Sequence, residues 1–441
     1  MFYRAQLSGG KICFCLNEQV LGKIFMYNHV VFEISGKCNA MCKWCVTGRK
    51  NRQEKRLGSF ISPEIFQKAI NYLKNESIIE KDAYFFIYNW GEPFLHPQFR
   101  EIVNILNKED IVYIISTNAS KVVTFNEPHI LKNLRAIVFS MPGFSQRSYD
   151  KIHGFNLEFI KQNIQKILSN YYQNGFQGKA EIRYHVYQFN IDEISDLMTF
   201  AKENNLGISP TYAGISDLEL FMDYLSGRLS PTLLKEVSQD LLLFYSEELQ
   251  ALMPNDYKCP YHDVLLIDED CQVLTCCLVT RNMQNYSIGS LFDLNIEKMK
   301  QLKKNQPICK DCLKLSIPFI INNRPYPKMI DEMDLHLPFV DKNRDIFIWG
   351  TGQMGKVFCK NLIQKGYAIK GFVHSKDTEY KTSLFNIPVF KEKKIFQHVN
   401  KQIPFVIVAN EYIKESIDKL ISNGYSLKED VYTSNVIRRE I

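Results

Sequence analysis

The alternation of strand-like and helix-like segments is the feature that most restricts the fold of this chain. Between residues 30 and 215, six short runs rich in β-branched and aromatic residues are separated by longer segments with helical periodicity. In chain order the runs are VVFEIS, AYFFIYNW, VYIISTN, AIVFSM, EIRYHVYQF and GISPTYA. Strands that alternate with helices pair in parallel, because each helix carries the chain back across the sheet. The pattern therefore predicts an α/β fold with six β/α units in an open or partly closed barrel.

The composition is that of an ordinary globular protein and excludes several classes. With 441 residues, 45% hydrophobic and 23% charged, the chain can bury a large core and should divide into about two or three domains. No apolar run reaches the ~18 residues of a membrane helix, and MFYRAQLSGGKICFC lacks the apolar core of a secretory signal. A net charge of +6 is too small at this length to indicate nucleic-acid binding. We expect a cytoplasmic protein with no membrane or nucleic-acid partner.

The twelve cysteines are grouped in short spacings rather than spread along the chain. A disulfide-stabilised scaffold would need a higher density, and in a reducing compartment grouped cysteines indicate metal binding or catalysis. The first group is EISGKCNAMCKWC, in which Cys38, Cys42 and Cys45 follow the first predicted strand. These three thiols are the first candidate metal ligands.

Three cysteines suit an iron–sulfur cluster better than a zinc ion. A structural zinc site usually takes four ligands, and no fourth Cys or His lies close by in the sequence. Three thiolates on a cubane cluster leave one iron open, and an open iron can bind the amino and carboxylate groups of a ligand. A zinc ion completed by a distant residue is the alternative.

The spacing C-x3-C-x2-C, with Trp44 before the last cysteine, resembles the signature of the radical S-adenosylmethionine enzymes. Later segments support this resemblance. NWGEPFLHP resembles the family's Gly-Glu-Pro motif at Gly91, Glu92 and Pro93, which receives the methionine amino group of the cofactor. STNAS follows the third predicted strand, and the segment beginning FSMPGF resembles the family's passage from strand to helix. The resemblance covers roughly residues 30 to 215.

The resemblance implies a [4Fe–4S] cluster on the three cysteines and S-adenosylmethionine as a second cofactor. The cluster would pass one electron to the sulfonium, and the resulting 5′-deoxyadenosyl radical would abstract hydrogen from the substrate. The residues expected to bind S-adenosylmethionine are Gly91, Glu92, Pro93, Asn118 and Ser140, with Ser140 at the ribose. Most of them follow predicted strands, and parallel sheets bind ligands at the carboxyl ends of their strands.

The fifth predicted strand, EIRYHVYQF, offers polar side chains to the same site. A strand period of two places Arg183, His185 and Tyr187 on one face and the residues between them on the other. We expect Arg183 and His185 to be the catalytic residues, in contact with substrate or cofactor, and the alternative is that both are structural. His153, which nothing in the sequence pairs, is expected to be structural.

The basic stretch GRKNRQEKRLG at residues 48–58 follows the first cysteine group. Most such runs are solvated surface. The functional alternative is a docking surface for an acidic electron donor, such as flavodoxin or ferredoxin with its reductase, or a site for a substrate phosphate.

A second cysteine-rich block resembles the shortened SPASM, or twitch, extension of the same enzymes, which holds an auxiliary [4Fe–4S] cluster. LLIDEDCQVLTCC indicates two strands joined by a turn, and CKDC is placed on a later loop. The expected ligands are Cys259, Cys276, Cys309 and Cys312. Cys277 is the alternative to Cys276, because adjacent strand residues face opposite ways. Cys271 takes the place of a turn glycine and is not expected to be a ligand, and a structural zinc remains the alternative for the block.

The last hundred or so residues restart with a strand, a glycine turn and a helix in RDIFIWGTGQMGKVFCKNLIQKG. Gly350, Gly352 and Gly355 form a G-x-G-x-x-G turn that would let a pyrophosphate approach the helix N-terminus. The next strand ends in His374, where an NAD-binding domain has an acidic residue. The segment resembles small Rossmann-like domains appended to enzymes of sugar and glycan biosynthesis, and a packing or dimerisation domain is the alternative.

These readings divide the chain into six regions. They are an N-terminal segment (1–29), the partial (β/α)6 barrel (30–215), a helical connector (216–256), the auxiliary-cluster module (257–317), a proline-containing linker (318–343) and a Rossmann-like domain (344–441). Within the connector, Ser230 and Pro231 are expected to begin a helix.

We expect a radical enzyme of the oxidoreductase type that acts on a small molecule. A sugar, an aminocyclitol or a nucleotide sugar is favoured, with dehydrogenation or rearrangement as the reaction. The alternative is a maturase that modifies a ribosomal precursor peptide. Such an enzyme usually carries an N-terminal peptide-binding domain, for which the thirty or so residues before the first strand are too few.

Overall fold

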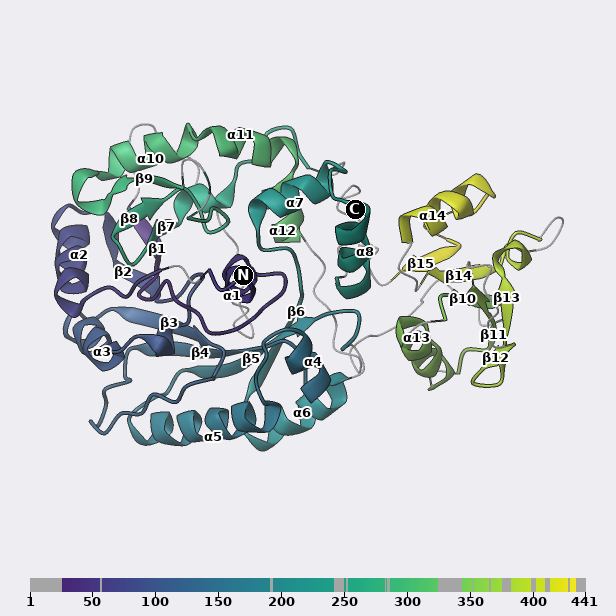
Figure 1. Cartoon of the computed structure of the whole chain (residues 1–441), viewed down its shortest axis with the longest axis horizontal. Helices are drawn as coiled ribbons and strands as arrows, with labels where there is room; N and C mark the ends of the chain where they lie inside the picture. The colour runs from purple at the N-terminus through teal and green to yellow at the C-terminus, as the bar shows by residue number, and fades with distance from the viewer. Residues whose placement is uncertain are drawn as a thin grey trace.

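The computed structural model describes most of the chain. The described residues are 26–55, 58–190, 193–241, 250, 253–281, 283, 286–323, 343–351, 353–364, 366–374, 382–397, 402–408, 413–426 and 429–433. The predictions for residues 1–25 and for Gly352 lie outside them. Over the described residues the strands form two sheets, one of nine strands and one of six. Figure 1 shows each sheet with its own helices.

The six predicted strands are present in the larger sheet and are all parallel. They are β1 (Tyr27–Phe32), β2 (Ile79–Phe86), β3 (Val112–Thr117), β4 (Leu134–Met141), β5 (Lys179–Val186) and β6 (Gly207–Tyr212). Each strand pairs with the next one in the chain. The prediction of an α/β fold with a parallel sheet is confirmed.

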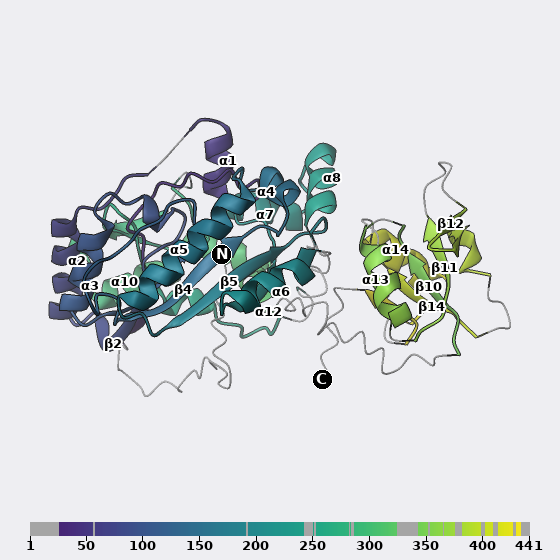
Figure 2. The same ribbon diagram turned by 90° about the horizontal axis from the view of Figure 1, so that it is seen from below.

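Helices connect these strands. They are α1 (Val46–Arg52), α2 (Pro63–Asn75), the 3-10 helix η1 (Pro93–Leu95), α3 (Phe99–Lys108), α4 (Gln146–Lys151), α5 (Leu157–Gln173) and α6 (Ile194–Glu203). The Ser62 side chain caps α2 by accepting from Ile65 N, and Pro63 takes the first position, where no N–H is needed. In Figures 1 and 2, α2, α3, α5 and α6 lie along the outer face of the sheet, whereas α1 lies on the inner side.

The two faces of the sheet bury different side chains, as the strand period requires. On β4, Ile137 and Phe139 join the outer core beneath the helices, whereas Val138 joins the inner one. On β5, Ile182 and Tyr184 also belong to the outer core. Alternate residues of β5 therefore point to the inner face, where the polar site is found.

The second cysteine-rich block extends the larger sheet beyond β1. Its strands are β7 (Leu265–Ile267), β8 (Gln272–Leu274) and β9 (Ser287–Ser290). β7 pairs in parallel with β1, and β8 and β9 follow as antiparallel neighbours. The predicted hairpin is present, with Cys271 in its turn at a φ of 57°, a value that explains why glycine would suit this position. β9 is an additional strand that the sequence analysis missed.

The middle region contains further helices, of which α7 and α8 lie in the connector that was predicted to be helical. They are α7 (Leu218–Leu225), α8 (Pro231–Asp240), α10 (Ile296–Lys304), α11 (Pro307–Lys314) and α12 (Ile317–Asn323), with the 3-10 helices η3 (Pro260–Asp263) and η4 (Leu291–Asp293). Ser230 and Pro231 begin α8 as predicted. CKDC was wrongly placed on a loop, because it lies within α11, and α12 occupies the start of the predicted linker. None of the described helices has the length and apolar character that crossing a bilayer requires.

The smaller sheet contains the C-terminal strands. They are β10 (Ile346–Trp349), β11 (Ile369–His374), β12 (Ser383–Leu384), β13 (Ile387–Lys391), β14 (Phe405–Val408) and β15 (Val431–Thr433), with the short helix η5 (Glu392–Lys394) after β13. Their order is β12-β13-β11-β10-β14-β15, and every pairing is parallel except that of β12. In Figure 1 the sheet lies between α13 (Gln353–Gln364) and α14 (Ile413–Ser422).

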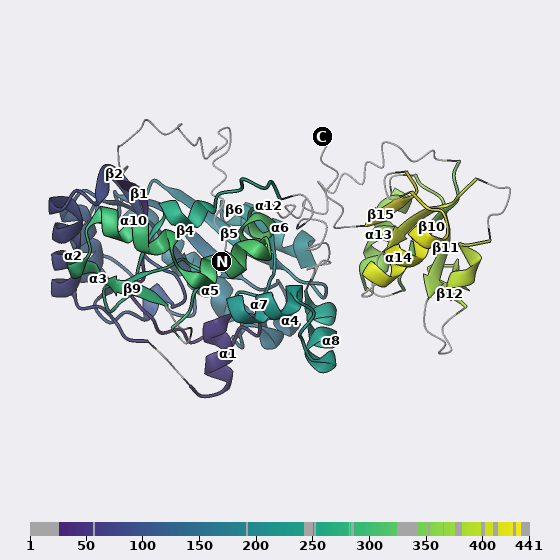
Figure 3. The same ribbon diagram turned by 90° about the horizontal axis from the view of Figure 1, so that it is seen from above.

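Figure 3, seen from above, shows α10 and β9 on the side of the larger sheet where the second cysteine block lies, next to α2. Tyr72 of α2 contacts this block through its hydroxyl, which lies 3.5 Å from the Leu294 carbonyl oxygen. The second cysteine-rich block is thus packed onto the edge of the parallel sheet.

Candidate active site

A cavity of about 1040 Å³, its open mouth included, lies at the carboxyl ends of the six parallel strands. Its walls include Cys38, Cys42 and Cys45 after β1, Trp90, Gly91 and Glu92 after β2, Thr117 and Asn118 at the end of β3, Ser140 of β4, Arg183 and His185 of β5, and Thr211 and Tyr212 of β6. Of the residues predicted for this site, Pro93 alone is not in the wall, since it is buried at the start of η1.

The three thiols after β1 are close neighbours. Burial raises the pKa of Cys42 well above its ordinary value, and the adjacent Cys45 and Cys38 thiols raise it further. The loop that carries them is fixed by Asn51, whose Nδ2 donates to the carbonyl oxygens of Cys38 and Ala40 at 2.8 Å each. Three thiols this close together, all partly buried, fit a positively charged partner that binds all of them.

As a donor set, three thiols fit an iron–sulfur cluster, because thiolates are its usual ligands. The described residues contain no group of three His, Cys, Asp or Glu side chains arranged to hold one metal ion. A cubane cluster bonds each thiolate to a different iron, so its ligands stand around it instead of converging on one point.

The basic stretch after the cysteines is partly used inside the protein. Arg49 forms an ion pair with Asp217 at 2.9 Å, and Arg52 donates to the carbonyl oxygen of Met41 in the cysteine loop. A β-carbon on Gly48 would lie 2.3 Å from the Cys42 carbonyl oxygen, so α1 packs directly on the loop. These contacts give the stretch a role in holding the loop, and its role in docking an electron donor stays a prediction.

The connector also grips the cysteine loop, through a residue that the sequence analysis missed. The buried Asp240 carboxylate at the end of α8 accepts from Lys43 Nζ at 2.8 Å, Trp44 Nε1 at 3.2 Å and Lys151 Nζ at 2.6 Å. The aromatic residue of the cysteine motif is thereby fixed to a helix some two hundred positions away in the chain. No local sequence signal marks Asp240.

Glu92 joins the ends of β2 and β3. Its carboxylate accepts from Asn118 N at 2.7 Å, Thr117 Oγ1 at 2.7 Å and Phe94 N at 3.1 Å. Burial raises its pKa to about 7, although these donors oppose the shift. Both oxygens are thus engaged within the protein, and a direct bond to the cofactor amino group stays a prediction.

Asn118 links β3 to the first cysteine. Its Nδ2 donates to Asn39 Oδ1 at 3.1 Å and lies 3.9 Å from Cys38 Sγ. An amide that approaches a thiol in this way would also donate to a cluster thiolate. The residue therefore connects the end of β3 with the cysteine loop, and its contact with a cofactor stays a prediction.

The polar residues of β4 and β5 meet on the cavity wall. His185 Nε2 lies 3.1 Å from Ser140 Oγ, and Arg183 pairs with Glu181 at 3.2 Å. Burial, followed by the charge of Arg183, lowers the pKa of His185 to about 3, so this imidazole is neutral near pH 7. The predicted cofactor residue on β4 and the two predicted substrate residues on β5 thus share one surface.

His153, which was predicted to be structural, also lines the cavity. Its ring is buried, and its Nδ1 has no hydrogen-bond partner among the described residues. Burial lowers its pKa to about 3, so it too is neutral near pH 7. A neutral imidazole at this place is available to a bound ligand.

The second group of cysteines forms a site of its own. Burial raises the pKa of Cys312, and the thiols of Cys276, Cys259, Cys309 and Cys277 add to this effect in that order. Five thiols therefore lie together, four of them the predicted ligands. Burial and then Cys276 raise the pKa of Cys309 to about 11. The choice of Cys276 over Cys277 as a ligand stays a prediction. Burial, Asp268 and Asp270 raise the pKa of Cys271, and Lys68 opposes the shift. No other thiol contributes to it.

A buried lysine stands beside this second site. Lys303 of α10 is fully buried, and its Nζ donates to the carbonyl oxygens of Tyr261 and Val264. Burial lowers its pKa to about 8, while the thiols of Cys276 and Cys259 oppose the shift. The sequence analysis missed this residue, since its importance depends on packing between α10 and η3.

The glycine turn of the smaller sheet is tightly packed. A β-carbon on Gly355 would lie 2.0 Å from the Gly350 carbonyl oxygen, so α13 starts directly against the turn. His374 Nδ1 lies 3.3 Å from Thr351 Oγ1, so the imidazole lies beside the turn. This is the position at which NAD-binding domains have an acidic residue. Binding of a nucleotide here stays a prediction.

Comparison with protein families and with curated proteins finds no match. Solved structures do match. They include Streptococcus suis SuiB bound to its precursor peptide SuiA (14% identity, 64% of this chain and 66% of SuiB, TM-score 0.43), anSMEcpe with bound AdoMet (14%, 66% and 83%, 0.41), and BtrN in complex with AdoMet and 2-DOIA (12%, 68% and 94%, 0.35).

The matched proteins are radical S-adenosylmethionine enzymes. SuiB too has been solved with S-adenosylmethionine, so this molecule is bound in structures of all three. The match covers just under two thirds of the SuiB chain. At these identities the likeness concerns the fold, and the function has to be inferred from this chain's own residues.

Proposed function

We propose that this protein is a radical S-adenosylmethionine enzyme. The observation that carries the proposal is the convergence of three neighbouring, partly buried thiols with the Gly91–Glu92 loop, Asn118 and Ser140 on one cavity at the carboxyl ends of parallel strands. When bound, a [4Fe–4S] cluster and S-adenosylmethionine would supply a 5′-deoxyadenosyl radical. The six-stranded parallel part would then be the partial (β/α)6 barrel of this family.

The chain's own residues would bind, orient and shield the reacting groups. Cys38, Cys42 and Cys45 would hold the cluster, the backbone around Gly91 would receive the methionine end, and Ser140 would meet the ribose. Arg183 and His185 would face the substrate from β5, with His185 neutral and fixed by Ser140. With cofactor and substrate bound, the cavity walls would keep water from a reactive radical.

The second cysteine site is proposed to hold an auxiliary [4Fe–4S] cluster on Cys259, Cys276, Cys309 and Cys312, as in twitch modules. α11 supports this set, because residues three apart on a helix face the same way and so bring Cys309 and Cys312 together. Four protein ligands leave no iron open to a substrate, so such a cluster suits transfer of an electron. Dehydrogenation of the substrate follows as the proposed reaction.

We infer that the substrate is a sugar, an aminocyclitol or a nucleotide sugar. Hydroxyl, imidazole and guanidinium groups of Ser140, His185 and Arg183, with Thr211 and Tyr212, line the substrate side of the cavity. Such a wall suits a molecule rich in hydroxyl groups, whose hydrogen bonds need partners once buried. The smaller sheet, with its tight glycine turn, is proposed to be Rossmann-like and to receive a nucleotide.

Iron counting tests the two clusters. Protein reconstituted without oxygen should hold close to eight irons, and a triple variant with alanine at Cys38, Cys42 and Cys45 should hold about four and lose all cleavage of S-adenosylmethionine. About four irons in the parent, together with stoichiometric zinc, would contradict the auxiliary cluster.

Deuterium transfer tests the substrate class. A panel of sugars, aminocyclitols and nucleotide sugars deuterated at ring carbons should include one that passes deuterium to 5′-deoxyadenosine. A precursor peptide encoded beside the enzyme serves as the competing substrate. Label transfer from the peptide and from none of the sugars would replace this proposal with a peptide maturase.

A further inference from the structure

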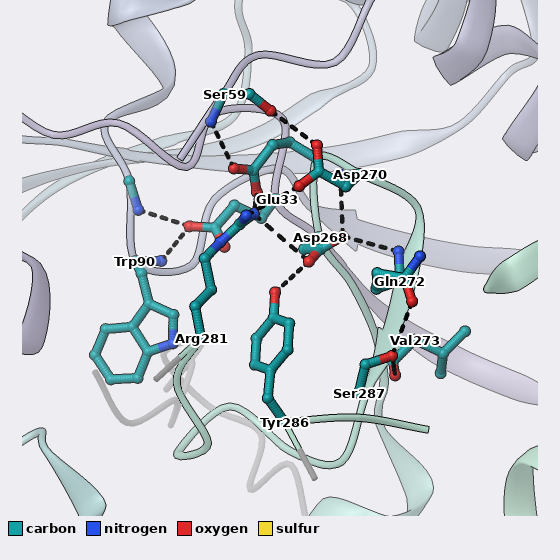
Figure 4. Close-up of polar contacts among 12 residues, drawn as sticks. Glu33, Ser59, Trp90, Asp268, Asp270, Gln272, Val273, Arg281, Tyr286 and Ser287 are labelled. Atoms are coloured by element: carbon teal, nitrogen blue, oxygen red, sulfur yellow. Dashed lines mark hydrogen bonds and ion pairs between the residues drawn. The ribbon is translucent and has the colours of Figure 1, made fainter. Parts of the chain in front are cut away.

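A buried acidic residue stands behind the loop that is proposed to receive the cofactor. Glu33 follows β1 directly, and its side chain is almost completely buried. Its Oε1 accepts from Trp90 N at 2.6 Å, as Figure 4 shows, and from Gly91 N at 2.7 Å. Two successive peptide groups of the loop are therefore held by one carboxylate.

This grip fixes the direction of two carbonyl groups. In a trans peptide the N–H and the C=O point in opposite directions. Because the amides of Trp90 and Gly91 point at Glu33, the carbonyls of Asn89 and Trp90 point away from it. Both residues line the cavity, and no donor to either carbonyl is found in the described part of the chain. Two backbone acceptors are thus presented where an ammonium group could bind.

On its other side Glu33 faces the auxiliary module. Arg281, which follows the cysteine pair of that module, forms ion pairs with Glu269, with Asp270 at 2.9 Å and with Asp268 at 3.5 Å. Figure 4 shows this guanidinium beside Glu33. Among the described residues that Figure 4 labels, Arg281 is the cation that pairs with these three carboxylates.

The backbone between β1 and the auxiliary module is tightly packed. A β-carbon on Gly36 would lie 1.8 Å from Glu269 Oε1, and one on Gly91 would lie 1.7 Å from the Ser35 carbonyl oxygen. The main chain is joined as well, since Glu33 N donates to the Ile267 carbonyl oxygen of β7 at 2.9 Å. A displacement of the β7–β8 turn would therefore move Glu33.

We propose that Glu33 is a positioning residue through which the auxiliary module, by way of Arg281 and Glu269, sets the backbone of Trp90 and Gly91 for the methionine end of the cofactor. The inference rests on the proposed function. Loss of Arg281 would remove the ion pairs that hold Glu269 and Asp270 of the β7–β8 turn, and Glu33, whose N donates to Ile267 of β7, would move with that turn. Arg281 would thus act on a cofactor that it does not touch.

Amide hydrogen exchange tests the grip without any cofactor. In the full-length protein, Glu33→Ala should speed exchange of the Trp90 and Gly91 amides at least tenfold, and Arg281→Met should do so to a smaller degree. Glu33→Gln should keep the protection, because a carboxamide oxygen can still accept both bonds. Asp270→Asn is the matched control, since Asp270 also pairs with Arg281 but is 52% exposed. Unchanged exchange in Glu33→Ala would overturn the proposal.

Cofactor binding supplies the second measurement. With S-adenosylmethionine and reconstituted protein, Glu33→Ala and Arg281→Met should each raise Kd about tenfold or more, with iron content as in the parent. The double variant should be no weaker than Glu33→Ala, since both changes break one path. Losses that simply multiply would overturn the coupling. If the parent protein does not bind S-adenosylmethionine, the proposed function is refuted instead. The hydrogen-exchange result would still test the contact of Glu33 with the loop, because it needs no cofactor.

Discussion

The carboxyl group of Glu33 ties stability to pH. Burial, followed by the charge of Glu269, raises its pKa from 4.5 to about 8, so the folded state holds this proton more tightly than the unfolded state. A raised pKa contributes stability that is complete below pH 4.5 and is lost as the pH rises through about 8.

We therefore expect the free energy of unfolding of the parent to fall, relative to Glu33→Gln, between about pH 4.5 and pH 8. Urea unfolding of both proteins at several pH values measures this difference. Asp270→Asn serves as an exposed control and should run parallel to the parent. A constant gap between the parent and Glu33→Gln across this range would contradict the assignment.

Asp240 gives a second prediction at the scale of single residues. Asp240→Ala removes the acceptor of the buried Trp44 Nε1 and the partner of two lysines, which should cost about 1–3 kcal/mol of stability. The cysteine loop should also hold its iron less firmly. Asp223→Ala, which breaks an exposed ion pair with Arg228, should change stability by about 0.5 kcal/mol or less. Equal melting temperatures for the two variants would contradict the role of Asp240 in holding the cysteine loop.

At the scale of elements, α10 brings one positive charge to the second cysteine site. Lys303→Met removes this buried cation, so the potential of an auxiliary cluster should become more negative, because a nearby cation favours the reduced form. Lys304→Met, at the exposed neighbouring position, should leave the potential unchanged. Redox titration followed by electron paramagnetic resonance compares the two variants, and equal shifts would show that Lys303 has no special effect.

Most of the strands and helices could be predicted from the periodicity of their apolar residues. The spacing between cysteines alone did not predict the element that carries them. The six parallel strands were recognisable because each combines β-rich composition with a flanking helical pattern, and Ser230–Pro231 gave the start of α8. The pair Cys309 and Cys312 fits a loop or a helix equally well by spacing. Pro307 at the first helical position was the overlooked signal. β9 was missed because its sequence, SIGS, has little strand character.

The candidate site divides in the same way. Arg183 and His185 were predicted because a strand period of two fixes the face of each residue. Asn51, Asp240 and Arg281 were missed because their partners lie on other elements, and nothing in their own neighbourhood announces these contacts. Residues that position a site through tertiary contacts therefore escape a reading of one sequence.

At the scale of the whole molecule, the two sheets should lose their structure separately. Trp349 of β10 is buried in a core made of residues from the smaller sheet and its surroundings. Trp349→Ala should therefore cost about 3–5 kcal/mol in that part. Thermal unfolding by circular dichroism should show an earlier transition, while absorbance of the iron–sulfur clusters should be lost at the temperature of the parent. Simultaneous loss of both signals would show a single cooperative unit.

The pairing of β1 with β7 has a consequence for synthesis of the chain. β1 is an inner strand of the finished sheet, with β2 on one side and β7 on the other. On the ribosome, however, the side that awaits Leu265 stays an open edge while all residues between Phe32 and Leu265 are translated. At 5–20 residues per second this interval is on the order of 10–50 s. An unpaired strand edge is a template for wrong partners, so the nascent protein should depend on a chaperone until the second cysteine block has left the exit tunnel.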